Sequence, residues 1–210
     1  SNVREDLLVD SLWPDADGDA ARFALTSAIH RLRKLLGHEQ AIIRKDNEIS
    51  LDDRYCWVDT WALERLLARC ETAWAGEEES WHKATGLVQR AAALYRGPFL
   101  GGDPEAPWGV SLADRLRRRL LRQLKLTGQR LEEKEQLQQA ADLYEEALRV
   151  DMCAEDVCRR LMILYYQLGR PTEVASIYRQ CREALNSQFG ISLSTETEEL
   201  LKKLRLSIAS

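Results

Sequence analysis

The chain has 210 residues, of which 45% are hydrophobic and 30% are charged, and its formal net charge is −4. This composition is typical of an ordered protein with one large or two small domains, and no apolar run approaches the roughly 20 residues that cross a bilayer. We therefore expect a cytoplasmic protein with no membrane partner. The acidic balance does not indicate a nucleic-acid binder, because residues 1–55 contain eight Lys and Arg against eleven Asp and Glu. DNA binding would require a local basic patch.

Residue types that carry catalysis or bind metals are sparse. The histidines, His30, His38 and His82, stand in no pattern with a nucleophile and an orienting carboxylate. The five cysteines lack CxxC or Cys/His zinc spacing, so we interpret them as small core residues. We expect no enzymatic activity, no catalytic residue, no metal and no cofactor.

The first segment, Val3–Leu12, has the pattern of a helix. One side of that helix carries three leucines, Leu7, Leu8 and Leu12. Trp13-Pro14 ends the helix, because proline cannot continue a helical hydrogen-bond ladder. A turn-rich connector follows at residues 15–19, where Asp17 or Asp19 can cap the next helix.

Residues 22–37 predict a helix with two contrasting faces. Apolar residues at the spacing of a buried helix face are Leu25, Ile29, Leu32 and Leu36. The opposite face carries Phe23, Ser27, His30, Arg31 and Lys34. The segment contains four Arg and Lys and no carboxylate, which is the electrostatic footprint of a helix laid against phosphates. An ordinary amphipathic helix with a solvated basic face is the alternative interpretation.

A β-hairpin is predicted directly after this helix. We expect Gly37 to cap the helix, and the segments Ala41–Lys45 and Glu48–Leu51 flank the turn dipeptide Asp46-Asn47. Two helices joined by a short turn, the second one basic, form a helix-turn-helix pattern. A hairpin after that pattern is the second half of a winged helix, and it favours the DNA-binding interpretation.

Four motifs in this order carry a family resemblance: LWPD, HRLRKLLG, the hairpin AIIRKDNEISLD and WVDTWALERLL. Together they resemble the response-regulator-type winged helix of bacterial regulators of the antibiotic-regulatory-protein (SARP) class. The version they look closest to lies at the C-terminal end of large ATP-dependent, MalT-like STAND regulators. Such winged helices begin with a small antiparallel sheet and a first helix. We find neither in the sequence, so residues 1–55 are expected to be a partial winged-helix domain.

The resemblance also implies site residues. It places groove-facing side chains at Phe23, Ser27, His30, Arg31 and Lys34, phosphate contacts at Arg22 and Arg33, and wing contacts at Arg44 and Lys45. It implies that Arg31 reads a base edge, as arginine commonly does with guanine in the major groove. Phe23 departs from the family pattern, because that position is more often polar. A bulky apolar residue there fits either a contact with a thymine methyl or a protein-binding surface.

The rest of the chain, residues 56–210, has helical patterns broken by a loop over Gly101–Gly109. Ala140, Tyr144 and Ala147 recur 34 positions later as Val174, Tyr178 and Cys181, which is the tetratricopeptide signature of stacked helix pairs. Ser194 or Thr195 is expected to cap the last helix, with Glu198 completing a capping box from Thr195. Two segments resemble the bacterial transcriptional activation domain: YRGPFL followed by Trp108, and YRQCREALNSQFGISLSTETEELLKKL.

Six basic side chains crowd one predicted helix of this region: Arg115, Arg117, Arg118, Arg119, Arg122 and Lys125. They could extend a DNA footprint or hold an acidic partner. We favour a solvated surface, balanced by the carboxylates that follow at Glu132, Glu133 and Glu135.

The sequence as a whole predicts a mainly α-helical protein, with a partial winged helix-turn-helix and a β-hairpin wing followed by a tetratricopeptide-like helical repeat domain. Our leading hypothesis is the DNA-binding output region of a bacterial transcriptional regulator, with the basic helix in the major groove of double-stranded DNA. The helical domain would form a homodimer, or contact RNA polymerase or another protein. The alternative is a protein–protein interaction module whose degenerate winged helix does not bind DNA.

Overall fold

The computed structural model describes residues 2–74, 79–97, 99 and 107–208. The chain divides into two compact units, unit 1 (Ser1–Ala62) and unit 2 (Leu63–Ser210). The division falls within α3 (Asp59–Trp74). Most of the loop expected at Gly101–Gly109 lies outside the described residues, but α5 begins at Pro107, so the end of that segment is helical and not a loop.

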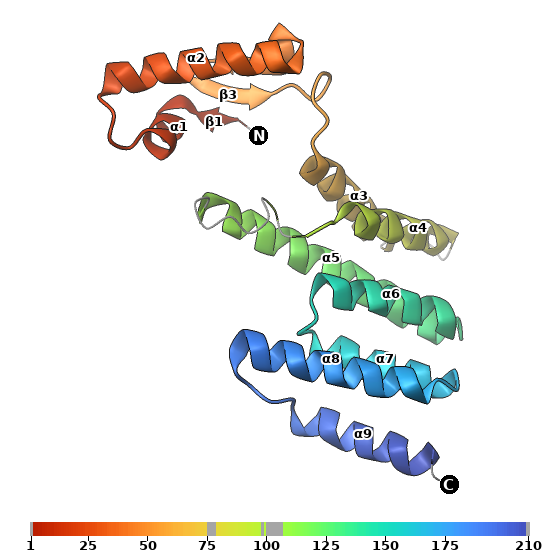
Figure 1. Cartoon of the computed structure of the whole chain (residues 1–210). Helices are drawn as coiled ribbons and strands as arrows, with labels where there is room; N and C mark the ends of the chain where they lie inside the picture. Colours follow the sequence, from red (N-terminus) through yellow and green to blue (C-terminus); the bar gives the residue numbers. More distant parts are fainter. Residues whose placement is uncertain (1, 75–78, 98, 100–106, 209–210) are drawn as a thin grey trace. The chain divides into compact units, whose positions relative to one another are not determined.

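Unit 1 combines two helices with a small antiparallel sheet (Figure 1). Its elements are β1 (Val3–Arg4), α1 (Glu5–Leu12), α2 (Gly18–Leu36), a 3-10 turn (Glu39–Ala41), β2 (Ile42–Lys45) and β3 (Glu48–Leu51). The strand order is β1-β3-β2. Asp17 caps α2 by accepting a hydrogen bond from the Gly18 amide at 3.0 Å, and Gly37 ends it in the left-handed conformation, as predicted.

The first two residues of the predicted first helix form a strand instead. Val3 pairs with Ile49 and Arg4 with Glu48, and the Glu5 amide then donates to the Asn47 carbonyl at 2.9 Å. The helix therefore begins at Glu5 and not at Val3. A sheet partner far along the chain decides this conformation, so local periodicity could not have shown it.

The hairpin follows the prediction closely. Ile42–Lys45 pairs with Glu48–Leu51, and the register places Lys45 opposite Glu48. Asp46 and Asn47 have φ values of 53° and 60°, which is the double left-handed geometry of a type I′ turn. Asp and Asn tolerate that geometry better than most residues, because their short polar side chains bond locally.

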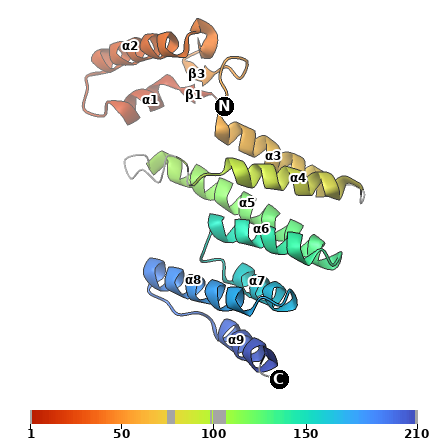
Figure 2. The ribbon, with the colours of Figure 1, turned by 45° about the vertical axis from the view of Figure 1, so that its right-hand side comes forward.

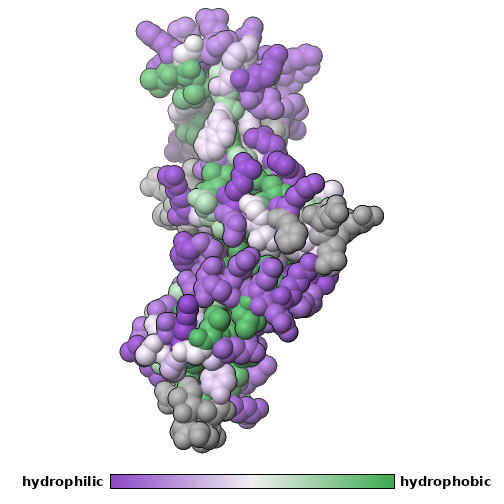
Figure 3. All heavy atoms as spheres, turned by 90° about the vertical axis from the view of Figure 1, so that its right-hand side faces the viewer, coloured by the Kyte–Doolittle hydropathy of each residue, from purple (hydrophilic) through white to green (hydrophobic). Residues whose placement is uncertain are grey.

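The core of unit 1 covers only part of the predicted apolar stripe of α2. Leu25, Ile29 and Ile42 are buried, and Leu8, Val9, Trp13 and Ile49 pack against them. Leu32 and Leu36, which were expected to be buried, are 48% and 50% exposed, and the neighbouring Leu35 is 82% exposed. Hydrophobic residues on the surface of unit 1 are visible at the top of Figure 3. On α1, Leu7 and Leu12 are also exposed, because Leu8, Val9 and Trp13 face the core instead.

Unit 2 consists of helices that stack in chain order (Figures 1 and 2). After α3 they are α4 (Glu79–Leu94), α5 (Pro107–Glu133), α6 (Leu137–Val150), α7 (Glu155–Gln167), α8 (Pro171–Phe189) and α9 (Thr195–Ile208). All six residues of the predicted 34-residue repeat are buried in one continuous core: Ala140, Tyr144, Ala147, Val174, Tyr178 and Cys181. Burial of both sets agrees with paired helices that cover one another's apolar faces.

The cap of α9 differs from the expected capping box. Thr195 is the first helical residue, and Ser194 is the cap, whose hydroxyl lies 3.4 Å from the Thr197 amide. The carboxylate that accepts the Ser194 amide, at 2.8 Å, belongs to Glu155 of α7. Glu198 instead accepts a hydrogen bond from the Tyr178 hydroxyl at 2.6 Å, so both carboxylates tie α9 to neighbouring helices.

A glycine of α5 allows a close approach between α5 and α6. A Cβ atom at Gly128 would lie 2.5 Å from Tyr144 Cε1, and the Tyr144 ring is fully buried. The Tyr144 ring of α6 therefore packs directly on the α5 backbone at Gly128.

We predict that Gly128→Ala destabilises unit 2 by about 1–3 kcal/mol, because the added methyl overpacks a buried ring that has no room to move. Gly86→Ala is the matched control, since Gly86 lies within α4 and no atom lies within 4 Å of the place that its new methyl would take. That control should be neutral or stabilising by up to about 1 kcal/mol. Urea unfolding followed by circular dichroism tests both, and equal midpoints for the two variants would contradict the prediction.

Candidate nucleic-acid interface

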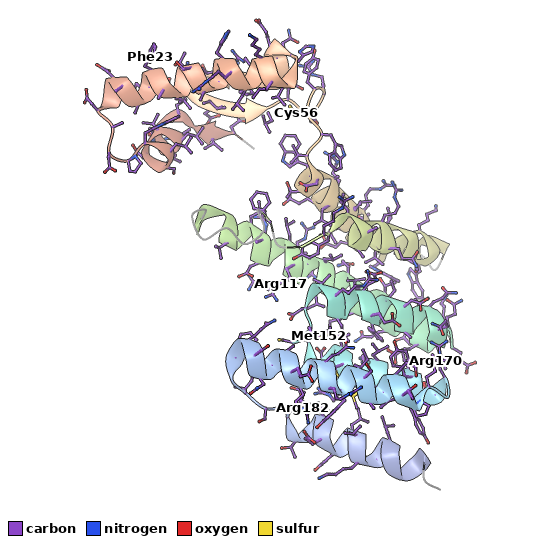
Figure 4. The ribbon with its side chains drawn as sticks, in the orientation of Figure 1. Phe23, Cys56, Arg117, Met152, Arg170 and Arg182 are labelled. Atoms are coloured by element: carbon purple, nitrogen blue, oxygen red, sulfur yellow. The ribbon has the colours of Figure 1, made fainter. Side chains whose placement is uncertain are left out.

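The solvent face of α2 brings five of the sequence-predicted site residues together. At 100° per residue, all five fall within about 100° of arc on the side opposite Leu25: Phe23, Ser27, His30, Arg31 and Lys34. Ser27 is half-buried and the other four are exposed. Figure 4 shows Phe23 on the face of α2 that points away from the sheet. The burial of Ala21, Leu25 and Ile29 against the sheet fixes this orientation.

Three cations of α2 are available to an anionic ligand. Arg22, Arg31 and Lys34 are exposed, and no carboxylate of the described part of the chain lies within ion-pair distance of them. Cations without internal partners keep their full charge for a ligand, whereas paired ones must first lose a partner. Three of the unpaired positive charges of unit 1 therefore lie on one helix.

Arg33 makes a contact within unit 1 that the sequence did not predict. Its Nε and Nη2 atoms donate to the Ile42 carbonyl at 3.2 and 2.6 Å, and the side chain is half-buried. The guanidinium therefore joins α2 to the start of β2, so fewer of its N–H groups are available to a phosphate. Its sequence position gave no signal of this role, because the acceptor is a backbone atom.

Arg44 of the wing is also held within unit 1. It donates from Nε to Glu5 Oε1 at 2.5 Å and from Nη2 to Glu5 Oε2 at 2.7 Å, and its Nη1 lies 3.2 Å from Thr26 Oγ1. One guanidinium thus ties the hairpin to α1 and α2. Lys45 remains exposed, 4.0 Å from the equally exposed Asp46 carboxylate, so it is the wing cation that can reach a ligand. Glu5 and Thr26 were not among the predicted site residues.

We predict an acid-sensitive contribution of the Glu5–Arg44 pair to the stability of unit 1. Hydrogen bonds from Arg44 lower the pKa of Glu5 below its ordinary value of 4.5. The ionised carboxylate therefore stabilises the fold above about pH 4.5, and this contribution disappears as the pH falls through the lowered pKa. Glu5→Gln should lower the urea midpoint of unit 1 at pH 7, and the difference from the parent should shrink below pH 4.5.

Hydrogen exchange in the β2–β3 hairpin at increasing urea concentration measures that midpoint. Glu39→Gln is the control, because Glu39 is exposed and forms no ion pair within the described residues. The same pH dependence in both variants would show that the Arg44 pair does not cause it.

The basic helix of unit 2 is largely neutralised, but not by the predicted carboxylates. Its ion pairs join Arg115 to Glu64 at 3.0 Å, Arg117 to Asp151 at 2.9 Å, Arg119 and Arg122 to Glu71 at 3.0 and 2.9 Å, and Lys125 to Asp156. Glu132 instead contacts Tyr144 and Arg160, and Glu133 pairs with Arg130. Five of the six cations therefore pair with carboxylates of neighbouring segments, and Arg118 is exposed without an ion pair in the described part of the chain, which leaves little free charge for a second DNA footprint.

Other kinds of site have little support in the described part of the chain. No group of three or more His, Cys, Asp or Glu residues there could hold a metal ion. The cysteines are free, and Cys70, Cys158 and Cys181 are buried. Among the described helices, none has the length and apolarity needed to cross a membrane.

Residues 58–205 match the sequence profile of a family described as bacterial transcriptional activator domain. The chain belongs to this family. Regulatory protein AfsR of Streptomyces griseus is a relative, 24% identical over 201 residues that cover 94% of this chain and 20% of AfsR. The chain of this activator-domain protein therefore spans about a fifth of that relative.

The fold of this activator-domain protein is similar to that of a solved structure, Mycobacterium tuberculosis EmbR in complex with a low affinity phosphopeptide. The TM-score is 0.64 with 20% sequence identity, and the match covers 99% of this chain and 55% of EmbR. At that identity the likeness shows the fold alone. It includes the small sheet of unit 1 as well as the helices of unit 2.

Proposed function

We propose that this chain is the DNA-binding output region of a bacterial transcription regulator. Membership of the transcriptional activator family supports a role in transcription. The observation that carries the DNA assignment is on α2, where Arg31 and Lys34 of the solvent face and Arg22 beside it are exposed without carboxylate partners within ion-pair distance in the described structure. A helix with such a face, followed by a hairpin, has the docking surfaces of a winged helix in the major groove.

The proposal gives these cations separate roles. Arg31 lies on the groove-facing arc and reads a base edge, as a bidentate arginine does on guanine. Arg22 and Lys34 contact phosphates on either side, and Lys45 contacts the backbone next to the wing. Arg33 and Arg44 hold the helix and wing in place from within unit 1. Base contacts then specify the sequence, while phosphate contacts position the helix.

The helical unit supplies contacts to other proteins in this proposal. Stacked helix pairs such as α5–α8 present extended surfaces that bind partners. We propose that unit 2 mediates dimerisation or contact with RNA polymerase or another protein. The second candidate function is a protein-interaction module that does not bind DNA, and the 76% exposed Phe23 on the basic face favours it.

We predict salt-sensitive binding of the chain to duplex DNA in fluorescence anisotropy between about 50 and 200 mM salt. Lys34→Ala should reduce the slope of log affinity against log salt by about one, because one phosphate contact is lost. Arg31→Ala should weaken discrimination between selected and random duplexes by roughly 1–3 kcal/mol. Arg179→Ala, an exposed cation of α8 with no ion pair within the described residues, should change neither quantity.

Two results would contradict this proposal. One is the absence of binding at about 50 mM salt, where even non-specific electrostatic contacts are strong. The other is an equal loss of affinity in Lys34→Ala and Arg179→Ala, which would show that α2 is not the contact surface. The first result would leave the interaction module as the better description, and the second would place the DNA contact on a surface other than α2.

A further inference from the structure

Phe23 is the one residue of the groove-facing arc that neither the charge of the helix nor the packing of unit 1 explains. Its side chain is 76% exposed, and the described structure shows no aromatic or cationic group against its ring. A single exposed hydrophobic residue is ordinary on a protein surface. Phe23 is different because it shares the groove-facing arc with Ser27, His30, Arg31 and Lys34, on the face of α2 that points away from the sheet (Figure 4).

The position of Phe23 along α2 suits contact with bases. It is the sixth residue of a 19-residue helix, and residues near the start of a recognition helix are those that reach base edges. Arg31 lies eight residues further, about 12 Å along the axis. That separation corresponds to roughly three to four base pairs at 3.4 Å each, so Phe23 and Arg31 would contact different base pairs.

The chemistry of the ring restricts what Phe23 can recognise. A phenyl group has no hydrogen-bond donor or acceptor, so against a guanine, adenine or cytosine edge it would desolvate polar atoms without replacing their water. Thymine is the base that displays an apolar group, its C5-methyl, in the major groove. An apolar side chain on a groove-facing helix surface is therefore complementary to that methyl.

We propose that Phe23 is a specificity-determining residue that packs against the C5-methyl of a thymine, about three to four base pairs from the guanine that Arg31 contacts. This inference rests on the proposed DNA-binding function and adds a second, apolar element to its sequence preference. Leu35 provides an internal comparison, because it is 82% exposed on the same helix but lies 120° around the axis from Phe23 and one turn beyond Arg31.

The test uses the 210-residue chain and begins with selection from a random duplex pool. The enriched sequence is then resynthesised with each thymine replaced in turn by deoxyuridine, which keeps the hydrogen-bonding face and lacks only the methyl. We expect one thymine at which uracil weakens binding about fourfold, the effect of removing one methyl from an apolar contact. Phe23→Ala should bind the thymine and uracil duplexes equally, and Leu35→Ala should keep the fourfold preference.

The outcomes distinguish a failure of this inference from a failure of the proposed DNA-binding function. If selection enriches no sequence and binding is insensitive to salt, the proposed DNA function fails and the inference fails with it. If a sequence is enriched but no thymine is sensitive to uracil, or if Phe23→Ala keeps the sensitivity, Phe23 does not read a methyl although the chain binds DNA. Circular dichroism of Phe23→Ala should match the parent, since an exposed ring contributes little to folding.

Discussion

The small core of unit 1 is the constraint on which the geometry of the proposed interface depends. Its cluster contains three buried large side chains, Leu25, Ile29 and Ile42. A core of this size gives limited burial energy, so polar contacts must help to fix the orientation of the hairpin against α2. Arg44 joins the wing to Glu5 and Thr26, and Arg33 joins α2 to β2. Two of the four arginines first assigned to DNA thus shape the surface that the other two present.

Sequence patterns predicted the elements of unit 1 well and their burial less well. The left-handed preference of Asp46-Asn47 defined the hairpin, and capping residues placed both ends of α2. Helical periodicity showed which face of α2 is apolar but not how far its neighbours cover that face, so Leu32 and Leu36 were wrongly expected to be buried. The roles of Arg33 and Arg44 depend on acceptors brought close by folding. For the same reason the partners of the α5 arginines, up to 51 residues away, could not be predicted.

Unit 2 shows how a helical stack can fix its alignment with buried polar groups. Three tyrosines each reach a carboxylate of a neighbouring part of the stack: Tyr144 contacts Glu132, and the Tyr165–Glu145 and Tyr178–Glu198 distances are both 2.6 Å. Burial and the adjacent carboxylate raise the pKa of Tyr165, so its hydroxyl remains a donor across the physiological pH range. Apolar faces alone allow helices to slide past one another, whereas a buried donor must keep its acceptor.

The contact of Tyr144 with the backbone at Gly128 has an evolutionary consequence. The Tyr144 ring of α6 occupies the space that a side chain at Gly128 of α5 would need. A relative with a side chain at the position of Gly128 would need a smaller residue at the position of Tyr144, because one change alone leaves a clash and the other leaves a cavity. The two positions should therefore covary across the family. A chimaera that combines repeats from different relatives should keep its helix packing best when both residues come from the same parent.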